Sequence, residues 1–264
     1  MLSACQIRQI IIEQSRRAGV GHIGSALSVA DIIAALYGGI INVQDVKDPE
    51  RDRFVLSKGH AALALYAALH LCDFIDQETL DSFCADGSKL GVHPELVCPG
   101  VDFATGSLGQ GLSFGVGAAL AARVQNSSRQ VYVLVSDAEC NEGALWESIM
   151  FAAHHRLDNL VAIVDLNGQQ AFGYTSEVIN LECLADKFRA FGWHVDEVDG
   201  HDLEALKITL AVAKGLSGKP KVLIAKTTFG KGVSFMEHQI KWHYSPLSES
   251  EFIQANRELE EINA

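Results

Sequence analysis

The chain of 264 residues lacks the features that would place it in a membrane or on nucleic acid. No apolar run reaches the roughly 18 residues of a membrane span. No basic segment followed by an apolar one opens the sequence, so secretion is not indicated. With 21 Lys and Arg against 33 Asp and Glu, the net charge is −12, which argues against broad contact with nucleic acid or anionic lipid. We therefore expect no nucleic-acid partner and no membrane.

Cysteine is sparse and scattered. The six cysteines form no CxxC pair and no Cys/His spacing of a zinc site. Reduced, partly buried thiols are the simplest expectation, and the cytoplasm is the natural compartment.

A GxxxxGK[ST] phosphate loop, an internal repeat and a Pro/Ser-rich linker are also missing. An anionic small ligand is not excluded, because backbone N–H groups and a metal can bind one locally.

What the sequence does contain is an alternation of short apolar runs with helical segments. Strands are predicted at 53–57, 131–137, 159–167, 193–200 and 221–228, and helices at 1–20, 28–40, 60–72, 113–124, 142–157 and 202–214. Continuous β-branched runs are typical of strands covered on both faces. The pattern predicts an α/β fold, a three-layer αβα sandwich with a mainly parallel sheet, in one domain over 1–264. The 48% hydrophobic content suggests that another protein chain covers part of the surface.

The stretch SDAECNEG, residues 136–143, holds three carboxylates between a predicted strand and a predicted helix. Asp137 ends one strand and Asn167 ends the next, so both should lie at the carboxyl edge of a parallel sheet, where ligands bind. Carboxylate and amide oxygens suit Mg²⁺ or Ca²⁺. The alternative is that Asp137 caps the helix and Asn167 makes a turn with Gly168. With Glu139, Glu142 and the loop GQQAFG nearby, we favour a metal site.

A glycine-rich turn, TGSLGQG at 105–111, leads into a helix of small residues. Its glycines permit close backbone approach, and a helix N-terminus offers free N–H groups to a phosphate. A purely structural turn is an equal alternative. The helix that follows, 113–124, has no polar face, so we expect it to be buried, with a neighbour that could belong to another subunit.

Four histidines stand in predicted loops beside glycine, proline or aromatic residues: His22, His60, His93 and His243. Loop histidines can donate to phosphate or sugar oxygens and move protons near neutral pH. For any one of them alone, a surface or structural role is the alternative. His194, His201 and His238 have no supporting context.

Taken together, six ordered segments resemble the N-terminal, diphosphate-binding part of transketolase. They are AGVGHIGSALSVADI, RDRFVLSKGHAALALY, GVHPE, TGSLGQGLSFGVGAALA, SDAECNEGALWESIMFAAHHRLDNLVAIVDLN and AKTTFGKGVSFMEHQIKWH. The resemblance covers about residues 5 to 247. It implies a thiamine diphosphate-binding fold and a cofactor, thiamine diphosphate, held through Mg²⁺, or Ca²⁺ or Mn²⁺ in its place.

The resemblance also implies roles for individual residues. The cation would be bound by Asp137, Asn167 and the backbone carbonyl of Gln169. Contacts to the cofactor would come from His60, Gly106, Ser107, Leu108, Gly109, Ala138, Glu139 and His243, besides Asp137 and Asn167. His22, His60 and His93 would line the sugar channel and move protons, with His243 beside them. Glu142 would join a carboxylate network that crosses a subunit interface.

Several positions depart from the family pattern. Ser136 and Ala138 flank the aspartate where the family commonly has glycines, Ile23 and Ser107 replace prolines, Phe229 replaces a frequent lysine, and Tyr244 replaces a glycine. Ala138 restricts backbone freedom that glycine allows, which bears on close approach to a diphosphate.

The resemblance ends where a complete transketolase would continue into a pyrimidine-binding and a C-terminal domain. We therefore expect a split transketolase, in which a second subunit carries those domains and an α₂β₂ heterotetramer transfers a two-carbon ketol unit between sugars or sugar phosphates. Two alternatives remain: the α subunit of a 2-oxoacid decarboxylating or carboligating enzyme, and a non-catalytic, transketolase-like protein that binds a partner.

Overall fold

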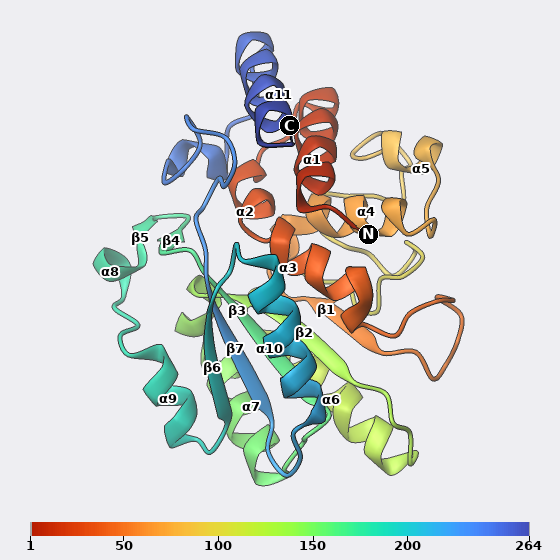
Figure 1. Ribbon diagram of the computed structural model, residues 1–264, viewed down its shortest axis with the longest axis vertical. Helices are drawn as coiled ribbons and strands as arrows, with labels where there is room; N and C mark the ends of the chain where they lie inside the picture. Colours follow the sequence, from red (N-terminus) through yellow and green to blue (C-terminus); the bar gives the residue numbers. More distant parts are fainter. Residues whose placement is uncertain (1, 264) are drawn as a thin grey trace.

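The computed structural model describes residues 2–263 and contains a five-stranded parallel sheet with helices on both faces (Figure 1). The strand order is β1-β2-β3-β7-β6, with β1 Arg53–Leu56, β2 Val131–Ser136, β3 Leu160–Leu166, β7 Lys221–Lys226 and β6 His194–Asp199. A short antiparallel pair follows β3, formed by β4 Gln169–Gln170 and β5 Gly173–Tyr174. The predicted three-layer αβα architecture is confirmed.

The central strands β2 and β3 are buried on both faces because they are almost entirely apolar, whereas the edge strand β6, HVDEVD, is largely polar and partly exposed. In β2 the side chains of Tyr132 and Leu134 enter one core, while those of Val131, Val133 and Val135 enter the other. This alternation is the two-residue period of a strand. The continuous apolar runs are thus explained by two cores, one on each side of the sheet.

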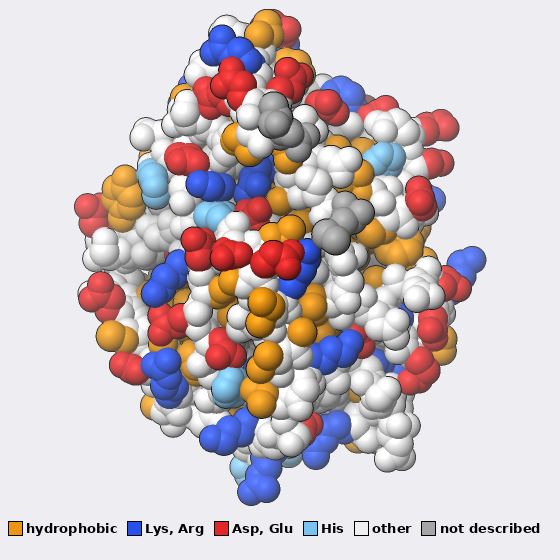
Figure 2. Space-filling view, in the orientation of Figure 1, with side chains coloured by type: hydrophobic (Ala, Val, Ile, Leu, Met, Phe, Trp, Pro, Cys, Tyr) orange, Lys and Arg blue, Asp and Glu red, His pale blue; other side chains and the backbone are white. Residues whose placement is uncertain are grey.

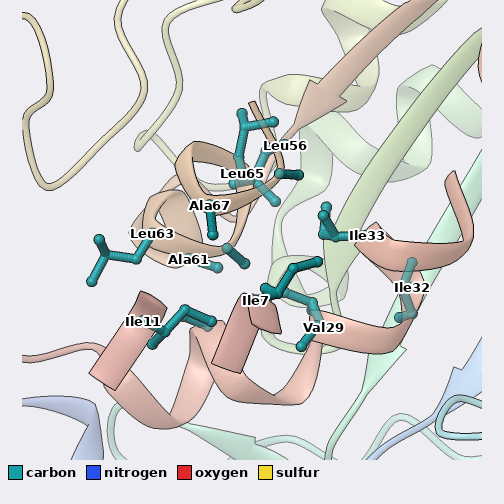
Figure 3. Packing of buried hydrophobic residues seen from close by; sticks show 14 of the residues in the cluster. Ile7, Ile11, Val29, Ile32, Ile33, Leu56, Ala61, Leu63, Leu65 and Ala67 are labelled. Atoms are coloured by element: carbon teal, nitrogen blue, oxygen red, sulfur yellow. The ribbon is translucent and has the colours of Figure 1, made fainter. Parts of the chain in front are cut away.

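The larger core lies between the sheet and seven helices. They are α1 Ala4–Ala18, α2 Ile23–Ser28, α3 Ala30–Ala35, α4 Ala62–Leu71, α5 Gln77–Asp81, α10 Leu203–Gly215 and α11 Glu249–Asn263. Figure 3 shows Ile11 of α1 next to Leu63 of α4, and Ile7 of α1 next to Val29. The first and last helices, α1 and α11, pack side by side (Figure 1).

The smaller core on the opposite face is closed by α6 Gly111–Val124, α7 Gly143–His154 and α9 Leu184–Ala190. The one-turn helix α8 Thr175–Val178 buries no side chain and leads from the β4–β5 pair towards α9. Among residues 2–263, no helix is long and apolar enough to cross a membrane.

The predicted helix over 28–40 corresponds to α3 and the helical turn that follows it. Val29 leaves helical geometry at φ −100°, ψ 3° and separates α2 from α3. Residues Leu36–Ile40 then form a π-turn in which Gly39 adopts φ 138°, a conformation that only glycine takes readily. Among the α-helices of residues 2–263, the sequence patterns did not predict α2, α5, α8, α9 and α11.

Helix α6 is covered by this chain on one side, and the expectation that a neighbour from another subunit covers the rest stays a prediction. Phe114, Gly117 and Ala121 are exposed, although the opposite side of the helix packs on β1 and β2. A second exposed apolar stripe runs along α10, at Ile208, Val212 and Leu216 (Figure 2).

Candidate functional site

A cavity of about 210 Å³ lies at the carboxyl edge of the sheet, where the loops after β1, β2, β3 and β7 meet. It is lined by His22, Ser25, Lys58, His60, His93, Gly106, Leu108, Ser136, Ala138, Asn167, Gln169, Gln170, Ala171, Phe229 and His243. Nine of the residues predicted for a site are in this lining. Segments up to 221 residues apart in the sequence therefore converge on one space, at the edge where open α/β sheets bind ligands.

Asp137 follows β2 and is fully buried beneath this cavity. Its carboxylate accepts hydrogen bonds from the backbone N–H groups of Ala138, at 2.8 Å, and Gly168, at 2.7 Å. Burial and the neighbouring Asp165 carboxylate raise the pKa of Asp137 to about 7. A buried carboxylate that has no cationic side chain as hydrogen-bond partner is an oxygen ligand suited to a hard cation.

Asn167 follows β3, the neighbour of β2, and it is oriented by Asp165. The Asn167 Nδ2 donates to Asp165 Oδ2 at 2.8 Å, and since a carboxylate only accepts, the amide oxygen must point the other way. That oxygen accepts from the backbone N–H of Gln169 at 2.9 Å and retains a second lone pair. The two predicted side-chain ligands of a cation, Asp137 and Asn167, thus come from adjacent parallel strands whose register pairs Ser136 with Asp165.

Lys58 and Asp165 form a fully buried ion pair at the floor of the cavity. Besides Lys58, the Asp165 carboxylate accepts hydrogen bonds from Ser28, Asn167 and Thr227. Burial alone would raise the pKa of Asp165, but Lys58 and these donors hold it below its usual value. Asp165 therefore stays ionised and fixes the groups around it.

Three polar atoms of residues that line the cavity are buried without a hydrogen-bond partner among the described residues. They are His22 Nδ1, Gln169 Oε1 and Gln170 Nε2. Buried polar groups in native proteins are almost always paired, so these atoms call for a polar ligand. Together with Asp137 and Asn167, they fit a ligand that combines a cation with hydrogen-bonding groups.

Three of the four predicted histidines form a cluster. The ring centroids of His22, His60 and His243 are 5.3 to 5.7 Å apart. Burial lowers the pKa of all three, and the nearby histidines and Lys58 lower it further, to about 4 for His243. His93 stands across the cavity against Gly106, with its pKa also lowered by burial. These rings are neutral at pH 7 and able to accept protons.

The glycine-rich turn is held from below by Glu139. The buried Glu139 carboxylate accepts from Ser57 Oγ at 2.5 Å, Gly109 N–H at 2.9 Å and Ser136 N–H at 2.9 Å. Gly106 has φ 143°, and a Cβ there would lie 2.9 Å from His93. Since Gly109 already donates its N–H to Glu139, the residues left to meet a ligand are those from Gly106 to Leu108.

The other predicted residues lie outside the lining. Ser107 is exposed at the tip of the turn, and Glu142 is exposed at the start of α7, with its side chain against Gly109. Ala138 does line the cavity, and it is not among the residues with positive φ, so its backbone does not require glycine.

Several site residues were not predicted from the sequence. Lys58, Ser25, Gln170, Ala171 and Phe229 line the cavity. Lys58 is part of the SKGH segment, but a lysine in a loop gives no sign that it is buried. Phe229 stood out only as a departure from the family pattern, although its ring stacks on His243 at 6.1 Å.

A larger depression of about 570 Å³ lies at the ends of β6 and β7. It is lined by Glu197, Val198, Asp199, His201, Lys226, Thr227, Thr228 and Lys231. Charged side chains of both signs face solvent there, and none of the residues predicted for a site contributes. The smaller cavity, where buried and unpaired polar groups converge, is the better candidate site.

Comparison with known proteins identifies the family of the chain. The family model of the transketolase, thiamine diphosphate binding domain, matches residues 2–261. The 6-deoxy-6-sulfo-D-fructose transketolase subunit of a Clostridium species is 42% identical over 261 residues, which cover 98% of this chain and 95% of that protein. An apulose-4-phosphate transketolase subunit from Phocaeicola vulgatus is 42% identical over 256 residues, covering 96% of this chain and 91% of that protein.

Longer transketolases match over part of their length. Human transketolase is 38% identical over 248 residues, covering 93% of this chain and 39% of that protein. The crystal structure of transketolase from Campylobacter jejuni superposes with a TM-score of 0.91 at 36% identity, covering 97% of this chain and 42% of that one. The chain thus spans less than half of these proteins. It belongs to the transketolase family, whose N-terminal thiamine diphosphate-binding domain it matches.

Proposed function

We propose that the chain is one subunit of a thiamine diphosphate-dependent transketolase. With a second subunit that carries the pyrimidine-binding and C-terminal domains, it transfers a two-carbon ketol unit from a ketose or ketose phosphate to an aldose or aldose phosphate. The observation that carries the proposal is the convergence of three neutral histidines with Asp137 and Asn167 on one cavity. This chain is then a single diphosphate-binding domain over 1–264.

The residues at the floor of the cavity fit the cofactor's diphosphate and a divalent cation. Asp137, Asn167 and the carbonyl of Gln169 would bind Mg²⁺, and the turn from Gly106 to Leu108 would meet the diphosphate. Bound thiamine diphosphate supplies the carbon nucleophile that the transfer needs. The protein's part is to hold the cation, orient the substrate and move protons.

The histidines provide the proton transfers. His22, His60 and His243 have lowered pKa values, so each is a neutral acceptor at pH 7. Among residues 2–263, no group hydrogen-bonds to His22 Nδ1. We propose that they bind and deprotonate the substrate's hydroxyl groups, and that His93 faces them from the opposite wall.

A partner subunit would complete the site. The cavity of about 210 Å³ is smaller than the roughly 300–1,000 Å³ usual for a small-molecule site, so it holds only part of a cofactor. Phe114 of α6 and Met150 and Phe151 of α7 are exposed on two helices that pack together, a suitable apolar interface. The exposed Glu142 begins α7 and is placed to reach across it. We propose an α₂β₂ assembly.

Reconstitution tests the activity. The chain is co-purified with its partner and assayed for ketol transfer over a panel of ketoses and aldoses, free and phosphorylated, with thiamine diphosphate and Mg²⁺. Transfer is expected from the pair and not from the chain alone. Decarboxylation of a 2-oxoacid without ketol transfer would indicate a 2-oxoacid enzyme instead, and a pair that does not bind the cofactor would be a non-catalytic relative.

Calorimetry of the pair tests the cation site. Asp137→Ala should weaken Mg²⁺-dependent binding of thiamine diphosphate by about 100-fold or more, because the variant removes a direct ligand of the cation (loss of a supporting residue alone costs about 10–100-fold). Asp196→Ala, at a partly exposed position on β6, is the matched control and should bind normally. Normal affinity in the Asp137 variant would refute the metal assignment.

A further inference from the structure

The segment Thr228–Lys231 follows β7 and contributes the aromatic side chain of Phe229 to the wall of the cavity. Phe229 is 2% exposed, and its ring stacks on that of His243 at 6.1 Å with an interplanar angle of 22°. On its other side it packs against Gly24, where a Cβ would lie only 2.2 Å from Phe229 Cε1. The ring therefore fills the space between the α2 backbone and a proposed catalytic histidine.

One end of this segment is held by His201. The His201 Nε2 accepts a hydrogen bond from the backbone N–H of Thr228 at 2.8 Å, and His201 Nδ1 lies 2.8 Å from Asp31 Oδ2. Because a backbone amide can only donate, Nε2 must be the acceptor and the ring proton must sit on Nδ1. His201 thus connects Asp31 of α3 directly to the residue that precedes Phe229.

The other end is held through the same carboxylate. Arg8 of α1 lies 2.5 Å from Asp31 Oδ2 and donates through Nε to the carbonyl of Lys231 at 3.1 Å. Arg8 and Asp31 are both buried, so the pair is shielded from solvent. Gly230 adds a backbone hydrogen bond to Gly24 at 3.0 Å. The segment is therefore fixed at Thr228, Gly230 and Lys231.

We infer that His201 is a positioning residue that, through Thr228, holds Phe229 against His243 and so fixes the orientation of that ring. His201 lines the neighbouring depression and not the cavity, so it acts on the site only through this segment. The catalytic consequence rests on the proposed function, whereas the geometric effect does not. The His243 imidazole takes part in no hydrogen bond among those described for residues 2–263. Packing against Phe229 would therefore be what orients this proton-transferring ring.

The test is a spectroscopic one on the full chain with ¹³C-labelled histidine. The ring signals of His243 are assigned by their loss in His243→Asn. Phe229→Leu removes the aromatic neighbour and should shift these signals. His201→Leu, which has no acceptor for the Thr228 N–H, should shift them in the same direction, whereas His201→Gln, which keeps an acceptor, should restore the native position.

A double-variant cycle establishes the route. If His201 acts through Phe229, His201→Leu should add little to the shift already caused by Phe229→Leu. His194→Gln is the control, because His194 is also bonded to an aspartate but on the exposed start of β6. Should His201→Leu fail to fold, His201→Asn, which can still donate to Asp31, takes its place. Unshifted His243 signals in a folded Leu or Asn variant overturn the inference.

Kinetics of the assembled pair then separate the two proposals. His201→Leu should lower kcat about tenfold with little change in KM, the loss expected when a proton-transferring group is misoriented. His201→Gln should recover most of it. If the His243 signals move as expected but the native pair transfers no ketol unit, the proposed function fails while the positioning role stands.

Discussion

Asp137 and Asp165 are both fully buried, at the ends of the neighbouring strands β2 and β3, yet their surroundings are opposite. Four side chains donate to Asp165, one of them the ammonium of Lys58, and its pKa is lowered. Asp137 receives two backbone N–H groups, and its pKa is raised to about 7. Asp165 is satisfied by side chains within the fold, whereas Asp137 has no side-chain donor, which supports its proposed role as a cation ligand. Burial is the same for both aspartates, so only the set of donors distinguishes them.

The largest expected effect, on the unfolding free energy, comes from removing the Asp165 carboxylate. Asp165→Ala leaves the ammonium of Lys58 buried without its partner, which costs about 3–5 kcal/mol. Urea unfolding measures the loss. Asp196→Ala, a partly exposed aspartate on β6, is the control and should change the unfolding free energy by less than about 0.5 kcal/mol. A loss below about 1 kcal/mol for Asp165→Ala would contradict the role given to the ion pair.

The raised pKa of the Asp137 carboxylate should make the unfolding free energy depend on pH. Its folded pKa, about 7, lies above the usual 3.8, so the folded state binds the proton more tightly than the unfolded state does. The stabilisation is present below pH 4 and is lost as the pH rises towards 7. Relative to Asp137→Asn, the ligand-free chain should lose on the order of 3 kcal/mol of unfolding free energy over this range.

Using the difference between the two proteins cancels the histidines, whose lowered pKa values act in the opposite direction. Saturating Mg²⁺ with thiamine diphosphate should abolish the pH dependence, because a bound cation keeps Asp137 ionised. A difference that is flat from pH 4 to 7 without ligand would mean that Asp137 is as well satisfied as Asp165.

The smallest effect should come from the residue that follows Asp137. Ala138 donates its N–H to Asp137 and does not have a positive φ, so the backbone conformation at this position does not require glycine. Ala138→Gly should lower stability by about 0.5–1 kcal/mol and change the affinity of the pair for thiamine diphosphate less than about twofold. Tenfold tighter binding in calorimetry would show instead that the Ala138 methyl obstructs the diphosphate.

The sheet and the pairing of Asp137 with Asn167 were predictable because they follow from local patterns. Two β-branched runs joined by one helix imply parallel neighbours, and parallel neighbours bring their final residues to one edge. The four histidines stood out by their loop context, the family resemblance gave them a shared role, and the structure brings them to one cavity. Their chemical roles, and those of Gly106 and Gln169, remain predictions.

The partners of these residues could not be predicted, because they depend on distant contacts. Lys58 and Asp165 are 107 residues apart, and nothing near either residue indicates that the other one neutralises it. His201 looked featureless because its partners, Asp31 and Thr228, lie 170 and 27 residues away.

Glu139 shows how folding prepares this site before any ligand arrives. Its two oxygens join Ser57 after β1, Gly109 of the glycine-rich turn and Ser136 of β2 into one unit. The turn is therefore rigid in the free protein, and an incoming diphosphate need not spend binding energy on ordering the loop. A conservative Glu139→Gln exchange would turn one acceptor into a donor that faces other donors, and so would loosen the turn. The main effect should be a slower association and a lower affinity for the cofactor.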